Sequence, residues 1–166
     1  MEKITEWMVQ ESLYRNLNEK KHRLIVPNCK ALGYEADVLS LTRAGFVSEF
    51  EIKLSRSDFR NESTRRSKKC KFQLYDSAQN INISSYSAMF CPNFFFYVCP
   101  KEIIQPEQVP DYAGLLWIVD LETTFFRVIL DAPKLHGYKL AEPKIEWMIR
   151  SMQAKFWKDR KKYRSE

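Results

Sequence analysis

Two acidic residues and a lysine have the types and the spacing best suited to chemistry in this sequence. Asp37 is followed after thirteen residues by Glu51-Ile52-Lys53. Alternate side chains of an extended strand share a face, so Glu51 and Lys53 are expected to point the same way. If Arg43-Ala44-Gly45 closes a hairpin, Asp37 and Glu51 lie at comparable distances from the turn. The sequence therefore predicts that these two carboxylates lie side by side.

Carboxylates brought together in this way favour a bound cation. Like charges on neighbouring strand positions repel, and their burial costs free energy unless they are paired or bind an ion. Mg²⁺ takes oxygen ligands, commonly one or two carboxylates with water and substrate phosphates. Lys53 is then placed to hold or help deprotonate an attacking water, or to stabilise charge that develops on a phosphate. Glu35 and Glu49 share these faces, and each is either a ligand or a residue at the rim of the site.

An ordinary charged sheet face is the alternative interpretation, because a single Glu-x-Lys is weak evidence for a site. Apolar neighbours favour the site, since they indicate strands that are largely buried. These neighbours are Val38, Phe50, Ile52 and Leu54.

The elements that must position these residues follow from hydrophobic periodicity. Val9, Leu13 and Leu17 recur every four residues and predict a helix over 5–18. A second helix is expected from 57 to about 80, either continuous or broken near 61–64, and a third over 145–163, with Pro143 near its start. Strands are predicted over 24–26, 35–42, 46–55, 92–99, 114–119 and 125–130. This order predicts an α/β fold with a mixed sheet flanked by helices.

The same residues resemble the PD-(D/E)XK, or restriction endonuclease-like, nuclease superfamily. Asp37 matches the first acidic element of its signature, and Glu51-Ile52-Lys53 matches the second. The resemblance implies a restriction endonuclease-like core over about 5–120, followed by a strand and basic helix over 121–166. It also implies Mg²⁺, with Mn²⁺ as a substitute, bound by Asp37, Glu51, Glu35 and the carbonyl of Ile52. Glu6 would complete the catalytic set from the first helix.

Within that superfamily, residues 34–59 are similar to a bacterial and phage group described mostly as nucleases or DNA-repair proteins. The exonuclease-like branches of the superfamily carry the pattern Gln-x-x-x-Tyr in the helix after the third strand, and this sequence departs from it. This chain has Gln73 and Tyr75 instead. The resemblance therefore favours an endonuclease or a structure-specific nuclease.

Charge supports a polyanionic partner, because the net charge is +6 and the isoelectric point is about 9.1. A basic stretch that runs from Arg56 to Lys71 follows the candidate site and is either a solvated helix face or a phosphate-binding surface. The run 155–164 mixes cations with aromatics, which suits stacked bases but also a solubilising tail. The residues predicted to bind nucleic acid are Arg56, Arg60, Arg65, Arg66, Lys68, Lys69 and Gln73.

The remaining composition limits the other function classes. The length of 166 residues predicts one domain, and the four cysteines, which are scattered without a CxxC pair, argue against a zinc knuckle. No apolar run reaches the length of a membrane span, so we expect a cytoplasmic protein of a bacterial or phage-infected cell. DNA is expected as the partner more than RNA, and a homodimer would allow both strands to be cut. The alternative function is a nucleic-acid-binding module of the same fold without cleavage.

Overall fold

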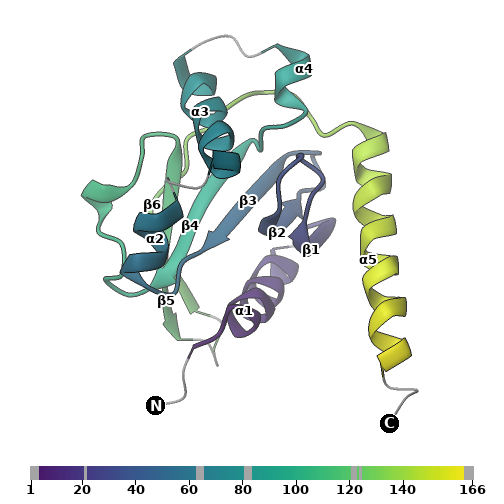
Figure 1. The fold of residues 1–166 in the computed structure, drawn as a ribbon, viewed down its shortest axis with the longest axis horizontal. Coiled ribbons are helices and arrows are strands. Elements are labelled where there is room, and N and C mark those ends of the chain that lie inside the picture. Colours follow the sequence, from purple (N-terminus) through teal and green to yellow (C-terminus); the bar gives the residue numbers. More distant parts are fainter. Residues whose placement is uncertain are drawn as a thin grey trace.

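A computed structural model describes residues 4–20, 22–62, 66–80, 84–120, 123 and 125–162 of the chain. A six-stranded sheet in the order β1-β2-β3-β4-β5-β6 forms its centre (Figure 1). The strands are β1 (Leu24–Cys29), β2 (Ala36–Leu41), β3 (Val47–Ile52), β4 (Phe94–Pro100), β5 (Ala113–Asp120) and β6 (Phe125–Leu130). The helices are α1 (Glu6–Glu19), α2 (Arg56–Glu62), α3 (Arg66–Asn80), α4 (Ser85–Ala88) and α5 (Glu142–Lys162), with a short 3₁₀ turn η1 (Pro106–Gln108).

The sheet is mixed, as the order of elements predicted. β3, β4 and β5 run parallel to one another, whereas β1, β2 and β6 are antiparallel to their neighbours. The α/β class with a mixed sheet flanked by helices is therefore confirmed. The expected helix over 57–80 is seen as two helices, α2 and α3, on either side of the undescribed residues 63–65.

One face of the sheet is covered by α1. Thr5 caps this helix through its hydroxyl, which accepts a hydrogen bond from the backbone N–H of Met8. The predicted stripe Val9, Leu13 and Leu17 is buried against apolar residues of the strands, which confirms the helical periodicity. On that face the strands contribute Val38, Phe50, Ile52, Val98 and Leu116.

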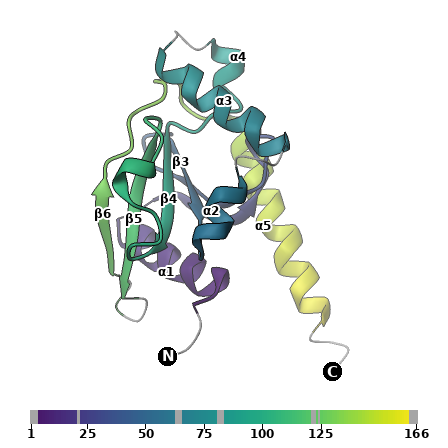
Figure 2. The same cartoon turned by 60° about the vertical axis from the view of Figure 1, so that its left-hand side comes forward.

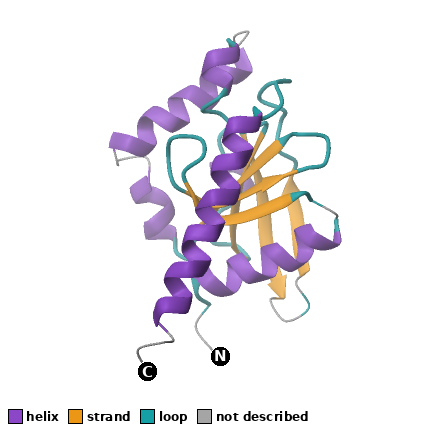
Figure 3. Ribbon diagram, turned by 90° about the vertical axis from the view of Figure 1, so that its right-hand side faces the viewer, coloured by secondary structure: helices purple, strands orange, loops and turns teal. Residues whose placement is uncertain are grey.

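Two helices share the opposite face of the sheet. α3 packs over β4 and β5, where Tyr75 and Ala78 join Phe95, Tyr97 and Leu115 in one apolar cluster. α5 packs over β1 and β2, where Ile145 and Met148 contact another cluster. That second cluster contains Val26, Leu39, Leu41 and Val47. Figure 1 shows α3 and α5 as separate helices, with strands visible between them, and Figures 2 and 3 show the same two helices from other sides.

The hairpin between β2 and β3 sets the register on which the site depends. Gly45 adopts φ 88°, a left-handed conformation that glycine tolerates best, and its N–H donates to the carbonyl of Thr42 at 3.0 Å. The pairing Leu41↔Val47 then continues to Val38↔Phe50. One further step along this register places Asp37 opposite Glu51, as the turn position predicted.

Candidate active site

Asp37, Glu51 and Lys53 come together at the carboxyl end of β3. Glu51 and Lys53 are almost completely buried, and Lys53 Nζ lies 3.1 Å from Glu51 Oε1. Asp37 is partly exposed, and its Oδ2 accepts a hydrogen bond of 2.7 Å from the backbone N–H of Ile52. The predicted triad is therefore assembled on one face of the sheet, with Asp37 on its open side.

The surroundings of Asp37 disfavour its ionised form. Burial and then the charge of Glu51 raise the pKa of Asp37 to about 7, with a smaller contribution from Glu6. The Ile52 N–H and Lys53 act in the opposite direction. Near neutral pH, ionised Asp37 thus lies against another acid, an arrangement that a bound cation would relieve.

Lys71 and Tyr75 extend the cluster from α3. Lys71 Nζ lies 3.1 Å from Glu51 Oε2 and directly contacts Glu49 Oε1, and the Tyr75 hydroxyl donates to Glu49 Oε2 at 2.6 Å. Burial lowers the pKa of Lys71, but the charges of Glu49 and Glu51 outweigh it and raise that pKa overall. Burial and Glu49 raise the pKa of Tyr75 as well, so its hydroxyl keeps its proton. This buried network fixes both glutamates against α3.

Lys71 is a site residue that the sequence interpretation missed, because it belongs to the basic stretch predicted to be a solvated or phosphate-binding surface. Its side chain is instead buried, at 1% exposure. A signal was present in the sequence: Lys71 precedes Tyr75 by four residues and Ala78 by seven, which places all three on one side of α3.

Two of the other acidic residues do not join the cluster as ligands. Glu35 precedes β2, is about half exposed and pairs with Lys30 at 3.3 Å, so the structure does not bring it to Asp37. Glu49 was expected as a ligand or a rim residue, and neither description fits. It is 2% exposed and held by Lys71 and Tyr75.

Glu6 lies at the margin of the site, linked to it by Gln10. Gln10 Nε2 lies 2.9 Å from Glu6 Oε1, 3.2 Å from the Asp37 carbonyl oxygen and 3.1 Å from Asn28 Oδ1. Glu6 itself is exposed. The first helix therefore does bring an acid near Asp37, and Gln10, which the sequence interpretation did not single out, is the residue that connects them.

The donor set can be compared with the needs of a hard cation. Among the described residues, no group of three or more His, Cys, Asp or Glu side chains could hold a metal ion. Mg²⁺, however, is commonly held by one or two carboxylates, with water and substrate phosphates as further ligands. Asp37 and Glu51 meet that requirement, and Oδ1 of Asp37 has no hydrogen-bond partner within the described part of the chain. The residues thus fit a magnesium ion bound with few protein ligands.

The predicted nucleic-acid-binding residues are only partly described. Arg56 and Arg60 are exposed and one turn apart on α2, directly after the triad. They line a pocket of about 480 Å³ with Phe59 and the segment 103–108. Gln73 is exposed on α3. Arg65 lies outside the described residues, as do the side chains of Arg66, Lys68 and Lys69.

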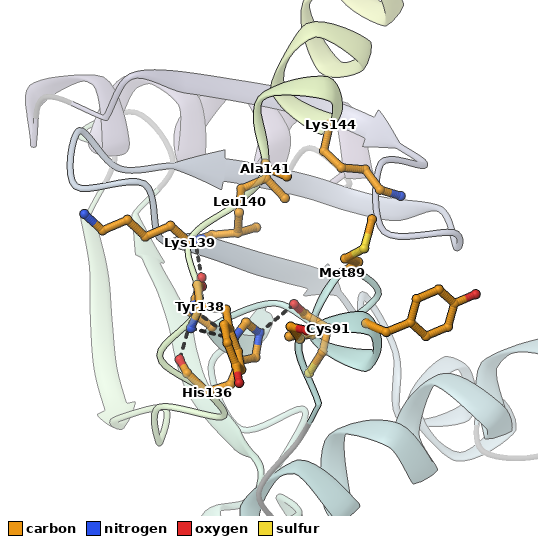
Figure 4. Close-up of a pocket in the computed structure, with 13 residues that line it drawn as sticks. Met89, Cys91, His136, Tyr138, Lys139, Leu140, Ala141 and Lys144 are labelled. Atoms are coloured by element: carbon orange, nitrogen blue, oxygen red, sulfur yellow. Dashed lines mark hydrogen bonds between the residues drawn. The ribbon is translucent and has the colours of Figure 1, made fainter.

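A second pocket, of about 380 Å³, lies at the other end of β3 (Figure 4). His136 Nε2 lies 2.9 Å from the Cys91 carbonyl, which can only accept, so Nε2 carries the proton. Nδ1 accepts from the backbone N–H of Tyr138 at 3.2 Å. Burial lowers the pKa of His136, which keeps the ring neutral. Both ring nitrogens are thus occupied in holding the chain before α5, which fits a structural role.

Removal of the charge on Asp37 is expected to stabilise the metal-free protein. Because the folded-state pKa lies above the ordinary value of 3.8, stability falls as pH rises from about 4 to about 7. We expect Asp37→Asn to match the wild type near pH 4 and to exceed it at pH 8 by on the order of 2 kcal/mol. Urea unfolding in EDTA at both pH values measures this, with Asp159→Asn, an exposed position on α5, as the control. If the stability of Asp37→Asn and of the wild type changed with pH in the same way, the raised pKa of Asp37 would be contradicted.

The comparisons with known proteins bear on the fold. No protein-family model and no curated protein matches the sequence. A solved structure of similar fold is the SPO1766 protein of unknown function from Silicibacter pomeroyi. The match has a TM-score of 0.59 and 21% sequence identity, and it covers 94% of this chain and 88% of that chain. At this identity the similarity shows a shared fold and says nothing of activity.

Proposed function

We propose that the protein is a Mg²⁺-dependent nuclease that hydrolyses phosphodiester bonds of DNA, as an endonuclease or a structure-specific nuclease. The observation that carries the proposal is the convergence of Asp37, Glu51 and Lys53 at the end of β3. Two opposed carboxylates provide ligands for a cation, and a lysine beside them provides a positive donor. This is the set expected for a restriction endonuclease-like centre of the PD-(D/E)XK type.

Each residue has a distinct task in this proposal. Asp37 and Glu51 bind the ion, together with the carbonyl of Ile52. A bound Mg²⁺ supplies charge neutralisation at the phosphate and lowers the pKa of water. Lys53 orients the attacking water or donates to the phosphate oxygen on which charge develops. Lys71, on α3, balances the negative charge of the buried Glu49 and Glu51 through its contacts with both carboxylates.

The surface around the site suits an anionic strand. Arg56 and Arg60 are exposed within one helical turn after the triad and line a shallow pocket. Among the described residues, no helix is long and apolar enough to cross a membrane. The net charge of +6 adds a general attraction for polyanions. DNA that lies across α2 would reach the triad with its phosphates near these arginines.

The test of the proposal is a cleavage assay with the full chain. Supercoiled, linear, branched and single-stranded DNA are incubated with Mg²⁺, with Mn²⁺ and with EDTA, and single-stranded RNA is included. We expect metal-dependent cleavage of at least one DNA substrate and none in EDTA. Binding to DNA without any cleavage, in either metal, would instead favour a nucleic-acid-binding module of the same fold.

Salt dependence tests whether α2 contacts the phosphates. Removal of both charges by Arg56→Gln with Arg60→Gln is expected to weaken binding to DNA and reduce the slope of log affinity against log salt by about 2. Fluorescence anisotropy between about 50 and 200 mM salt measures the slope. Arg15→Gln on α1, 56% exposed at its side chain, is the control. An unchanged slope in the double variant would show that the phosphates lie elsewhere.

A further inference from the structure

The second half of α5 carries an apolar stripe that is exposed in the described part of the structure. Ile145 and Met148 are buried on β1 and β2, whereas Met152 and Phe156, on the same side of the helix, are 38% and 54% exposed. Figure 3 shows α5 continuing past the strands toward the end of the molecule at which the N-terminus lies. The stripe is therefore continuous in sequence but leaves the protein core halfway along the helix.

This uncovered half begins beside the catalytic end of the sheet. Lys155 Nζ donates to the carbonyls of Pro27 and Asn28 at 2.6 and 2.7 Å. Asn28 in turn contacts Gln10, which lies 3.2 Å from the Asp37 carbonyl oxygen. Met152 and Phe156 lie on the same side of α5 as Ile145 and Met148, which pack on the sheet, and the contacts of Lys155 place this part of the helix at the end of β1.

The chemistry of this segment combines flat rings with positive charge. Phe156 and Trp157 lie edge to face with ring centroids 5.4 Å apart, and Trp157 is 63% exposed. The Arg160 guanidinium lies 5.6 Å from the centre of the Phe156 ring. Residues 155–162 contain the cations Lys155, Lys158, Arg160, Lys161 and Lys162 against the single acid Asp159.

Charge and geometry distinguish between possible occupants of this surface. A second copy of the chain would bring two cationic segments together, which like-charge repulsion disfavours. A membrane surface suits a helix with one apolar face, but Phe156 and Trp157 are successive residues that project about 100° apart on the helix. Single-stranded nucleic acid offers bases for the rings and phosphates for the cations.

We propose that the C-terminal half of α5, from Met152 to Lys162, binds unpaired nucleotides that lead away from the catalytic end, with bases stacked on Phe156 and Trp157. The inference rests on the proposed nuclease function and specifies its substrate class. The substrate is DNA in which a duplex adjoins a single-stranded tail or branch. The duplex phosphates lie near α2, and the unpaired strand follows α5.

Binding of labelled DNA to the full chain in EDTA tests this without any need for cleavage. The probes are a blunt duplex, the same duplex with a single-stranded tail, and that duplex with an abasic tail, which keeps the phosphates but has no bases. We expect the wild type to prefer the intact tail, and Trp157→Ala or Phe156→Ala to reduce this preference about tenfold. Tyr86→Ala, an exposed aromatic position on α4, is the matched control and should leave the preference unchanged.

Each contrary result overturns the inference. Equal binding of intact and abasic tails would exclude base stacking. An unchanged preference for the tail in Trp157→Ala would exclude this helix as the binding site of the unpaired strand. A dimer in the wild type that becomes a monomer in Trp157→Ala would assign the surface to a second copy, and sedimentation with anionic vesicles would assign it to a membrane. Cleavage of DNA by the wild type, assayed separately in Mg²⁺, shows whether the nuclease proposal stands when the stacking proposal fails.

Discussion

Replacement of Lys53 by Ala should lower the rate of DNA cleavage by roughly 10²- to 10⁴-fold, the contribution typical of a positioned proton-transfer or electrostatic group. Lys53 Nζ lies 3.1 Å from Glu51 and on the same side of the sheet as Asp37. An ammonium cannot ligate a cation, so its loss should leave metal binding largely intact. The rate is measured under single-turnover conditions on the DNA that the wild type cuts best.

Two companion variants make the result for Lys53 specific. Lys53→Met keeps most of the side-chain volume and should lose the same activity, which separates chemistry from packing. Lys30→Ala removes a lysine that is 63% exposed at its side chain and should cleave at the wild-type rate. If Lys53→Ala cleaved as fast as the wild type, Glu51-Ile52-Lys53 would be an ordinary charged segment of a sheet.

Lys71→Met should destabilise the fold by about 3–5 kcal/mol, because it leaves two buried carboxylates without their shared cation. Glu49 and Glu51 are 2% and 0% exposed, so solvent cannot replace the lost partner. Urea unfolding at pH 7.5 in EDTA measures the effect.

An exposed ion pair provides the control for Lys71. Lys101 pairs with Glu102 at 3.4 Å, with both side chains more than half exposed, so Lys101→Met should change the stability by less than about 1 kcal/mol. The double variant Lys71→Met with Glu49→Gln should recover part of the loss, since it removes the charge of Glu49, whereas Glu51 keeps Lys53 as a partner. Equal stability of Lys71→Met and Lys101→Met would show that the buried network contributes nothing to the free energy of unfolding.

The sequence predicted the part of the site that depends on local structure. Asp37 and Glu51 come together because a turn at Gly45 fixes the pairing of two short strands, and both the turn and the alternation can be recognised in the sequence. The order of helices and strands followed from periodicity for the same reason. The position of Glu6 near the site was expected only from the resemblance, which implies an acid in the first helix.

The part that could not be predicted depends on how separate elements pack. Lys71 faces the sheet, where it contacts Glu49 and Glu51 of β3, and this depends on the way α3 packs on the sheet. Glu35 has the same strand phase as Asp37, but β2 begins one residue later and Glu35 turns to Lys30. The exposed half of α5 likewise depends on where the sheet ends, which the helical pattern of residues 145–163 does not encode.

Binding of Mn²⁺ measured by calorimetry tests the central claim most directly, since the proposed centre is defined by its two carboxylates. The wild type, Asp37→Ala and Lys53→Ala are titrated in the same buffer at pH 8, where Asp37 is ionised. We predict that the wild type and Lys53→Ala bind the ion and that Asp37→Ala binds it at least about tenfold more weakly, which corresponds to the loss of one charged ligand, or about 1.4 kcal/mol. Equal affinity in all three proteins, or no binding by the wild type with or without DNA, would contradict a metal centre at Asp37 and Glu51.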